Sequence, residues 1–342
     1  MKRIPAGFIV PSACLTVPPK LLRGYELLEK RPEVGDVMYG RITYLGQHSS
    51  LENKQGRIHL INDGTRAVFV YGNRYASDAF EGFVPSESQQ QVDLLARSGI
   101  IGVMREKNAQ IKDPTRVKIL GNVLDSDGQP LNTRRFSIAD PRHSPNGDKK
   151  RAKMILVIGT SMNSGKSTAA LACCRALSAM GYAVRAAKIT GTASLKDILH
   201  MQDGGAHRVA DFSYLGFPST YMLDPAEVLG VFTRLDGRYG NNPANYWIVE
   251  LADGILQRET ALLLESPIVR RRVHKLVFAA SDALGAIGGL GVLRERFVLV
   301  PDAISGLCSS SPLGMRELRD FTQIPVFNSV DLNLKELAEI LI

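Results

Sequence analysis

The chain has 342 residues, of which 44% are hydrophobic and 22% charged, a composition typical of soluble globular proteins with room for two or three domains. No run approaches the roughly 18 apolar residues of a membrane-spanning helix, so we expect no membrane partner. The N-terminal stretch is broken by Pro5, Gly7 and Pro11 and makes a poor secretory signal. The four cysteines lack metal-ligand spacing and fit a reducing compartment, and we therefore expect a cytoplasmic protein.

The net charge is +8, and the basic excess lies mainly in the first 150 residues. That part carries 22 basic and 16 acidic residues, a net of +6, whereas the remainder carries 20 and 18, a net of +2. A basic excess attracts polyanions, but no basic patch interleaved with aromatic residues accompanies it. We therefore do not expect a nucleic-acid partner, although the sequence does not exclude one.

The region from about Gly35 to Leu131 has the pattern of short β-strands separated by turn signals. Two further stretches, Tyr25–Lys30 and Val92–Arg97, look briefly helical. The expected strands are Val37–Leu45, Gly56–Leu60, Ala67–Tyr71, Ile100–Val103 and Val117–Leu124. Regularly spaced short strands with polar turns predict a small antiparallel β-barrel or sandwich domain over residues 1–136.

Residues 137–153 are polar and contain two prolines and a basic cluster, which predicts a linker. From residue 154 to 342, apolar strands alternate with helical segments. The expected strands are Met154–Ile158, Ala183–Ile189, Tyr246–Leu251, Lys275–Ala280, Phe297–Val300 and Val326–Asn328, and the expected helices are Ser167–Met180, Ser194–Gln202, Pro225–Arg234, Leu256–Leu264, Ala283–Arg294 and Leu332–Ile342. This alternation predicts βαβ units and an α/β domain with a doubly wound, mostly parallel sheet.

A phosphate-binding loop follows the first strand of this domain. Small residues let successive backbone N–H groups face an anion, and the N-terminus of the next helix adds its dipole. In such a loop the lysine reaches the β- and γ-phosphates and the following hydroxyl binds Mg²⁺. The residues predicted to bind a triphosphate are Gly159, Thr160, Asn163, Ser164, Gly165, Lys166, Ser167 and Thr168.

Five residues, and not the usual four, separate Gly159 from Gly165. This spacing and the leading Gly-Thr resemble the loop of the dethiobiotin synthetase and cobyric acid synthase group of P-loop proteins. The loop is also similar to that of the D-glutamate N-acetyltransferase-like family. The resemblance covers about residues 152–342 and is specific mainly in the loop. Ser161 stands where the partition-protein branch has a second lysine, so that branch's mechanism is not carried over.

A P-loop needs an acid at the end of a neighbouring strand. Glu250 ends an apolar run and matches the acid of the dethiobiotin synthetase pattern, whereas Asp253 is an extra acid or a turn residue. In this group, an acid near residues 202–211 can complete the metal shell. We take Ser167, Glu250 and Asp211 as the metal ligands for Mg²⁺ and leave Asp203 open as an alternative. A general base at the neighbouring loop histidine, His207, is a weaker hypothesis.

Lys188 ends the second strand, where a doubly wound fold binds ligands. Its segment resembles the Lys-Pro-Val-x-Thr-Gly stretch of dethiobiotin synthetases, which implies a grip on an anionic substrate or on the migrating phosphoryl group. The expected catalytic residues are thus Lys166, Lys188 and Glu250. No Asn-Lys-x-Asp motif follows, so we expect ATP, with GTP as the alternative and Asp282 as a candidate contact to a purine edge. Arg270–Arg272 is read as a solvated helix end or, alternatively, a phosphate clamp.

Three functions remain open. The resemblance implies an ATP-dependent ligase or kinase-like enzyme that acts on a small acidic metabolite. The first alternative is a nucleotide-dependent switch or ATPase that controls a protein or nucleic-acid partner. The second is an acyl-CoA-dependent N-acyltransferase, because the loop also suits the pyrophosphate of an acyl-CoA. A homodimer is a further possibility.

Overall fold

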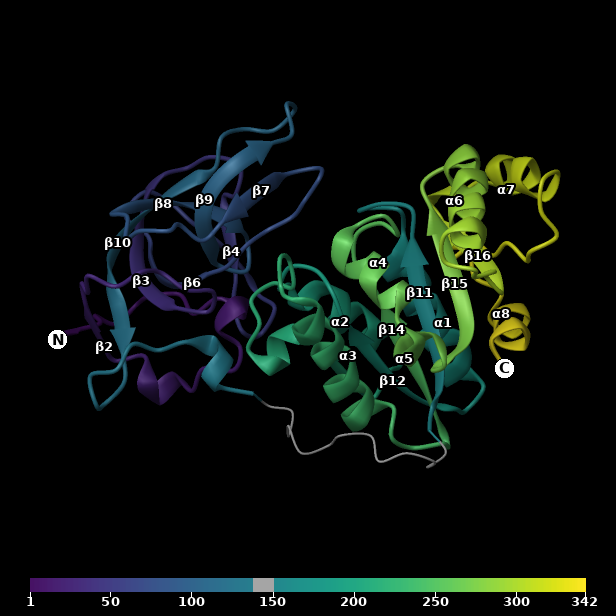
Figure 1. Ribbon diagram of the computed structural model, residues 1–342, viewed down its shortest axis with the longest axis horizontal. Helices are drawn as coiled ribbons and strands as arrows, with labels where there is room; N and C mark the ends of the chain where they lie inside the picture. The colour runs from purple at the N-terminus through teal and green to yellow at the C-terminus, as the bar shows by residue number, and fades with distance from the viewer. Residues whose placement is uncertain (138–150) are drawn as a thin grey trace. The chain divides into compact units, whose positions relative to one another are not determined.

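The computed structural model describes residues 1–137 and 151–342 (Figure 1). The chain divides into two compact units, which we call the barrel unit and the P-loop unit. The barrel unit comprises Met1–Ala139, Thr192–Lys196 and Phe212–Met222, and the P-loop unit comprises Asp140–Gly191, Asp197–Asp211 and Leu223–Ile342. Two short segments from the C-terminal part of the sequence therefore belong to the barrel unit. Most of the linker predicted at 137–153 lies outside the described residues.

The barrel unit is built around a closed ring of five strands. In the ring β3, β6, β9, β8 and β10 pair in this order, and β10 pairs with β3 again. Every pairing is antiparallel except that of β6 with β9. The strands of the unit are β1 (Lys2–Arg3), β2 (Gly24–Glu26), β3 (Val37–Tyr44), β4 (Ser50–Glu52), β5 (Ile58–Leu60), β6 (Arg66–Tyr71), β7 (Phe80–Phe83), β8 (Gln91–Ala96), β9 (Ile100–Lys107) and β10 (Thr115–Leu124). Closure leaves these five short strands without an open edge, and the predicted β domain is therefore a barrel.

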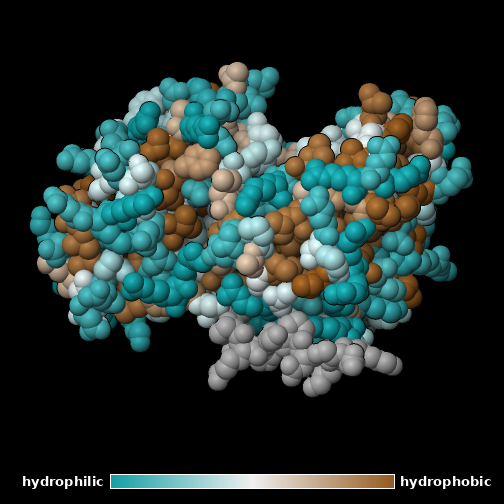
Figure 2. All heavy atoms as spheres, in the orientation of Figure 1, coloured by the Kyte–Doolittle hydropathy of each residue, from teal (hydrophilic) through white to brown (hydrophobic). Residues whose placement is uncertain are grey.

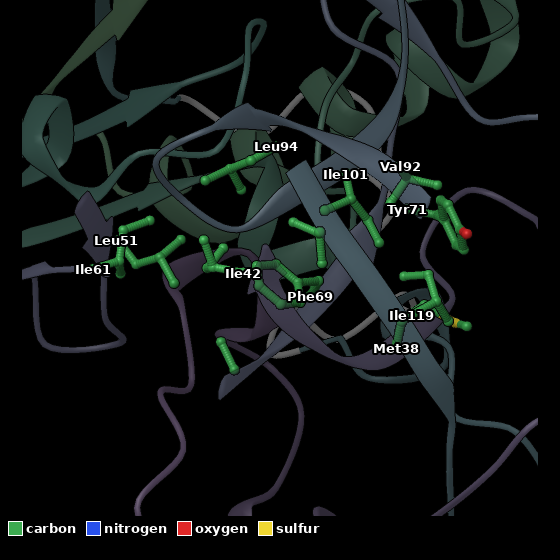
Figure 3. Packing of buried hydrophobic residues seen from close by; sticks show 12 residues of the cluster. Met38, Ile42, Leu51, Ile61, Phe69, Tyr71, Val92, Leu94, Ile101 and Ile119 are labelled. Atoms are coloured by element: carbon green, nitrogen blue, oxygen red, sulfur yellow. The ribbon is translucent and has the colours of Figure 1, made fainter. Parts of the chain in front are cut away.

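Alternate residues of the ring strands fill the barrel. Ala67, Phe69 and Tyr71 of β6 belong to one buried cluster with Ile42 of β3 and Val117 of β10, and Figure 3 shows side chains of this cluster packed together. The period of two within this cluster shows which face of the strand lines the barrel interior, although Val68 and Val70 on the other face of β6 are buried as well.

The same period explains two wrong helix predictions. Val92–Arg97 lies mostly in β8, where Val92 and Leu94 point into the core, and the start of Tyr25–Lys30 lies in β2. Pairing with neighbouring strands determines the conformation of both segments, and the helical preference of their local sequence does not.

The P-loop unit contains a six-stranded parallel sheet in the order β13-β12-β14-β11-β15-β16. Its strands are β11 (Lys153–Gly159), β12 (Ala183–Lys188), β13 (Arg208–Asp211), β14 (Asn245–Glu250), β15 (Val273–Ala280) and β16 (Ala303–Gly306). Its helices are α1 (Lys166–Ala179), α2 (Leu195–Asp203, whose first two residues belong to the barrel unit), α3 (Pro225–Tyr239), α4 (Arg258–Glu265), α5 (Pro267–Arg270), α6 (Ala283–Glu295), α7 (Pro312–Arg319) and α8 (Leu334–Leu341). This is the predicted α/β fold with a parallel sheet.

The strand order decides where a ligand can bind. The chain leaves β11 towards β12 on one side, returns through β14, and then continues to β15 on the other side of β11. Helix α1 packs on β11, β12 and β14, and α3 packs on β12 and β13. All carboxyl ends of a parallel sheet lie at one edge, and the reversal of direction beside the central strand opens a crevice there. The loop after β11 lies at that point.

Helix α6 is the most apolar helix of the unit. It buries Ala286, Gly289 and Leu293, whereas Leu284 stays 78% exposed. Figure 2 shows hydrophobic atoms on the surface over α6 and α7. The strand predicted at Phe297–Val300 is wrong, because these residues are irregular and Val298 has a φ of 52°. Among the described residues, no helix is both long and apolar enough to cross a bilayer.

Candidate nucleotide-binding site

The loop between β11 and α1 has the backbone of a phosphate cradle. Gly165 has a φ of 95° and Asn163 a φ of 60°, so the chain turns through left-handed conformations before the helix begins. A Cβ on Gly165 would lie 2.7 Å from the Cα of Gly306, which leaves no space for a side chain. No side chain caps the N-terminus of α1 at Gly165, so its first N–H groups face the loop. Backbone donors at a helix N-terminus bind anions such as phosphate.

Lys166 is buried inside this loop. Its Nζ donates a hydrogen bond to the carbonyl oxygen of Ser161 at 2.6 Å. Burial lowers the pKa of Lys166, against the opposing effect of Glu250 and Asp253. The ammonium group therefore lies among the loop's own backbone groups, where the phosphates of a nucleotide would bring it a stronger partner.

Ser167 lies between two carboxylates. Its Oγ is 3.1 Å from Oε1 of Glu250 and 3.3 Å from Oδ1 of Asp197. A hydroxyl has one proton and can donate to only one of these acceptors at a time. Three oxygen atoms from two carboxylates and a hydroxyl thus converge, and oxygen ligands of this kind are those that Mg²⁺ prefers.

Glu250 is the more buried of the two acids, with 1% of its surface exposed. Its second oxygen, Oε2, is buried and has no hydrogen-bond partner among the described residues. Burial raises the pKa of Glu250, although Lys188 and Lys166 oppose this effect. A cation at this position would satisfy the free oxygen and favour the ionised carboxylate.

Lys188 and Asp197 form a buried ion pair beside this group. Burial alone would lower the pKa of Lys188, but Asp197 and Glu250 outweigh it and raise the pKa above its ordinary value. Lys188 is the register partner of Glu250 on β14 and of Asp211 on β13. The lysine is therefore a permanent cation at the carboxyl edge of the sheet.

The remaining predicted loop residues differ in their burial and contacts. The N–H of Thr160 donates to the carbonyl of Ala279, and Ser164 is buried with an Oγ that has no partner among the described residues. Asn163 and Thr168 are exposed at the loop and at the start of α1. A Cβ on Gly159 would lie 2.4 Å from Ser164 Oγ, so glycine is required there.

Other predicted residues lie at different distances from the loop. Asp253 is buried beside both lysines, with a φ of 61°. Asp211 is buried at the carboxyl end of β13, and β12 separates this strand from β14. Asp203 ends α2, six residues and about 9 Å of helix beyond Asp197. The N–H of His207 donates to the carbonyl of Val184 at the opposite, amino-terminal edge of the sheet.

Two further candidates have structural partners. Arg272 precedes β15 at the amino-terminal edge and pairs with Asp236, so it lies away from the phosphate loop. Asp282 caps helix α6 by accepting a hydrogen bond from the N–H of Gly285 at 2.7 Å, and its position after β15 is at the correct edge.

Asp197 is the site residue that the sequence interpretation missed. It lies in the first turn of α2, three residues after Ser194, and the pattern Ser-x-x-Asp is typical of a helix start. An acid in the first turn of the helix that follows β12 was the available signal.

Comparisons with known proteins give only a distant likeness. No protein-family model matches the chain, and no curated protein matches it. Among solved structures, the signal recognition particle receptor FtsY of Elizabethkingia anophelis in complex with GDP is 16% identical, with 59% of this chain and 67% of that chain covered at a TM-score of 0.38. Chloroplast FtsY from Physcomitrella patens is 15% identical, with 58% and 68% covered at a TM-score of 0.37. Likeness at this level carries no inference about ligand or activity.

Proposed function

We propose that the P-loop unit binds a nucleoside triphosphate with Mg²⁺ and uses it for chemistry at the γ-phosphate. The observation that carries this proposal is the convergence of Ser167, Glu250 and Asp197 beside a glycine-rich loop and helix N-terminus. A buried carboxylate with a free oxygen is costly unless a ligand completes its coordination.

The chain's own residues suggest the following division of work. Backbone N–H groups of the loop and of the first turn of α1 hold the phosphates, and Lys166 exchanges the Ser161 carbonyl for phosphate oxygens. Ser167 and Glu250 would hold Mg²⁺, with Asp197 next to them, and the ion would neutralise charge on the β- and γ-phosphates. Lys188 then supplies a fixed positive charge for the transferred phosphoryl group or for an anionic acceptor.

Two roles for this chemistry remain, and a different observation favours each. The buried cation Lys188 favours an ATP-dependent ligase or kinase-like enzyme with a small acidic substrate, as the resemblance to dethiobiotin synthetases implies. The position of Asp197 favours the nucleotide-dependent switch, because the segment immediately before it, Thr192–Lys196, belongs to the barrel unit. Turnover that requires an added metabolite would support the enzyme. Slow hydrolysis that a macromolecule alters would support the switch.

Asp282, the candidate contact to a purine edge, already uses one oxygen to cap α6, and no guanine-binding Asn-Lys-x-Asp motif is present. We therefore propose ATP as the nucleotide and GTP as the alternative. The acyltransferase alternative predicts that acetyl-CoA binds the same loop without Mg²⁺. Competition between acetyl-CoA and ATP in one titration would separate these cases.

Calorimetric titration of the full chain with ATP, GTP and acetyl-CoA, each with and without Mg²⁺, tests the proposal. Lys166→Ala should weaken triphosphate binding by about 100-fold, because a charge-assisted contact to phosphate is lost. Lys153→Ala is the matched control: Lys153 starts the same strand, β11, is exposed, and contacts Tyr246 and Ile342. Unchanged triphosphate and acetyl-CoA binding in a folded Lys166→Ala protein would overturn the P-loop assignment.

A further inference from the structure

Three cations form a row across the outer face of the barrel. Lys118 of β10 is the register partner of Arg41 of β3, and Arg41 is the register partner of Arg66 of β6. All three side chains are exposed. Their neighbours along the strands, such as Ile42 and Ile119, belong to the barrel core (Figure 3). Successive side chains of a strand point to opposite faces, so the three cations share the outer surface.

Arg66 lies beside the hydroxyl of the buried Tyr39, but the fold gives no such reason for Arg41 and Lys118. Like charges directly opposite each other on neighbouring strands destabilise a sheet. Some other cations of the barrel unit have acidic partners, as Lys107 has Asp113 and Arg116 has Asp93. Within residues 1–137 and 151–342, no carboxylate lies within 4.0 Å of the charged nitrogens of Lys118, Arg41 or Arg66. The row is therefore an uncompensated positive stripe in the part of the chain that carries a net charge of +6.

An aromatic side chain lies at the end of the same strand. Tyr44 is the last residue of β3, is 52% exposed, and is the register partner of Arg116 on β10. A register shift between Arg116 and Val117 interrupts the alternation, so Tyr44 shares the face of Arg116, which lies two residues before Lys118 and therefore on the outer surface. Neighbouring strands are about 4.8 Å apart, so the three cations span roughly 10 Å along one line. A line of cations with an exposed aromatic ring is the combination that binds the phosphates and bases of single strands.

We propose that the outer face of β10, β3 and β6 binds single-stranded nucleic acid, with Lys118, Arg41 and Arg66 on successive phosphates and Tyr44 stacked on a base. This activity is separate from the nucleotide site and does not depend on it. The charge of the row attracts the strand from solution, and the ring provides the sequence-tolerant contact.

Fluorescence anisotropy of the full-length chain with labelled dT20 and U20, both without a terminal phosphate, tests the proposal at 50–200 mM NaCl. Three phosphate contacts predict a slope of log K against log[salt] of about −2. The variant R41Q/R66Q/K118Q should bind at least about tenfold more weakly and lose this slope. The control K20Q/R31Q/K112Q removes the same charge from exposed positions of the barrel unit and should bind like the unmodified chain. K166A should also bind like the unmodified chain.

A second measurement distinguishes function from structure. Removal of the repulsion should leave Tm unchanged or raise it in R41Q/R66Q/K118Q, so lost binding cannot be attributed to a damaged barrel. Y44F should retain binding and Y44A should lose about tenfold. No binding of dT20 or U20 at 50 mM salt, equal losses in the row and control variants, or no effect of Y44A would overturn the proposal. Preference for a 20-base-pair duplex or for anionic vesicles would assign the face to that partner instead.

Discussion

The buried carboxylates of the two units differ in how completely they are hydrogen-bonded. In the barrel unit, Asp36 accepts hydrogen bonds from Lys30, from the N–H of Glu33 and from Asn132. Asp93 accepts from Arg116 and from the N–H of Met104 at 2.8 Å. In the P-loop unit, Glu250 is equally buried, yet its Oε2 has no partner among the described residues. The first two acids tie strands and turns together, whereas the third keeps one oxygen without a hydrogen-bond partner among the described residues.

The contrast does not simply follow the two units. Asp236 of the P-loop unit is buried and is held by Arg151 and by two nitrogens of Arg272. It lies at the amino-terminal edge of the sheet, away from the phosphate loop. An unsatisfied buried polar group destabilises a protein by about 1–3 kcal/mol. Glu250 carries such a group at the carboxyl edge of the sheet, where a ligand would satisfy it. Hydrogen-bond completeness therefore distinguishes Glu250 from Asp36, Asp93 and Asp236, whereas burial does not.

Glu250→Gln should have the largest effect. The amide keeps the shape but removes the charge, so Mg²⁺-dependent triphosphate turnover should fall about 100-fold. The free energy of unfolding should stay the same or rise, because a buried carboxylate with an unsatisfied oxygen is replaced by a neutral group. Phosphate release at several Mg²⁺ concentrations and urea unfolding followed by the fluorescence of Trp247, the chain's only tryptophan, measure the two effects. A large loss of stability with normal turnover would contradict the comparison.

Asp93→Ala should have the opposite outcome. The change leaves Arg116 and the N–H of Met104 without their acceptor, which should lower the free energy of unfolding by about 2–3 kcal/mol. Circular dichroism during urea unfolding reports this loss, and nucleotide affinity should not change. The control Asp113→Ala breaks the exposed pair with Lys107 and should cost much less than Asp93→Ala, because solvent screens an exposed pair. Equal costs for both variants would mean that burial of Asp93 has no energetic role.

The sequence predicted the elements of each unit better than their pairing. The strand, loop and helix around Gly165 are consecutive in the sequence, and the residues of the loop themselves indicate the strand before it and the helix after it. This part of the site could therefore be predicted directly. Ring closure depends on β8 pairing with both β9 and β10, segments without any local mark of that contact. Asp197 was missed for the same reason: its approach to Ser167 depends on where α2 packs. Val298, in an apolar run that favoured a strand, is 76% exposed instead.

The free energy of unfolding should depend on pH through one histidine of the barrel unit, His48. His48 contacts the carbonyl of Leu95 and a guanidinium nitrogen of Arg74, each at 2.9 Å, and its ring meets Phe80 edge-on. Burial, with Arg74 adding to it, lowers the pKa of His48 to about 4.

The unfolded chain binds the proton near pH 6.5, so stability is complete above that pH and is lost as the pH falls towards 4. The expected loss is about 2 kcal/mol at pH 5. His48→Gln should flatten the dependence, and His59→Gln should not. A steep acid loss that persists in His48→Gln would refute the assignment.

Asp197→Asn should have the smallest effect, and it tests the one residue of the site that directly follows a barrel-unit segment. The change removes the negative charge that pairs with Lys188 and turns one of the two carboxylates near Ser167 into a neutral amide, while Glu250 remains. We expect triphosphate affinity to change by less than about threefold and turnover to fall about tenfold, because the lost charge positions Lys188 and does not itself hold phosphate. The double variant with Lys188→Met should be no worse than Lys188→Met alone if the two residues act as a pair. Additive losses in single-turnover kinetics would instead show that Asp197 acts on the metal independently of Lys188. If the switch is correct, Asp197→Asn should also abolish any effect of nucleotide on proteolysis within Thr192–Lys196.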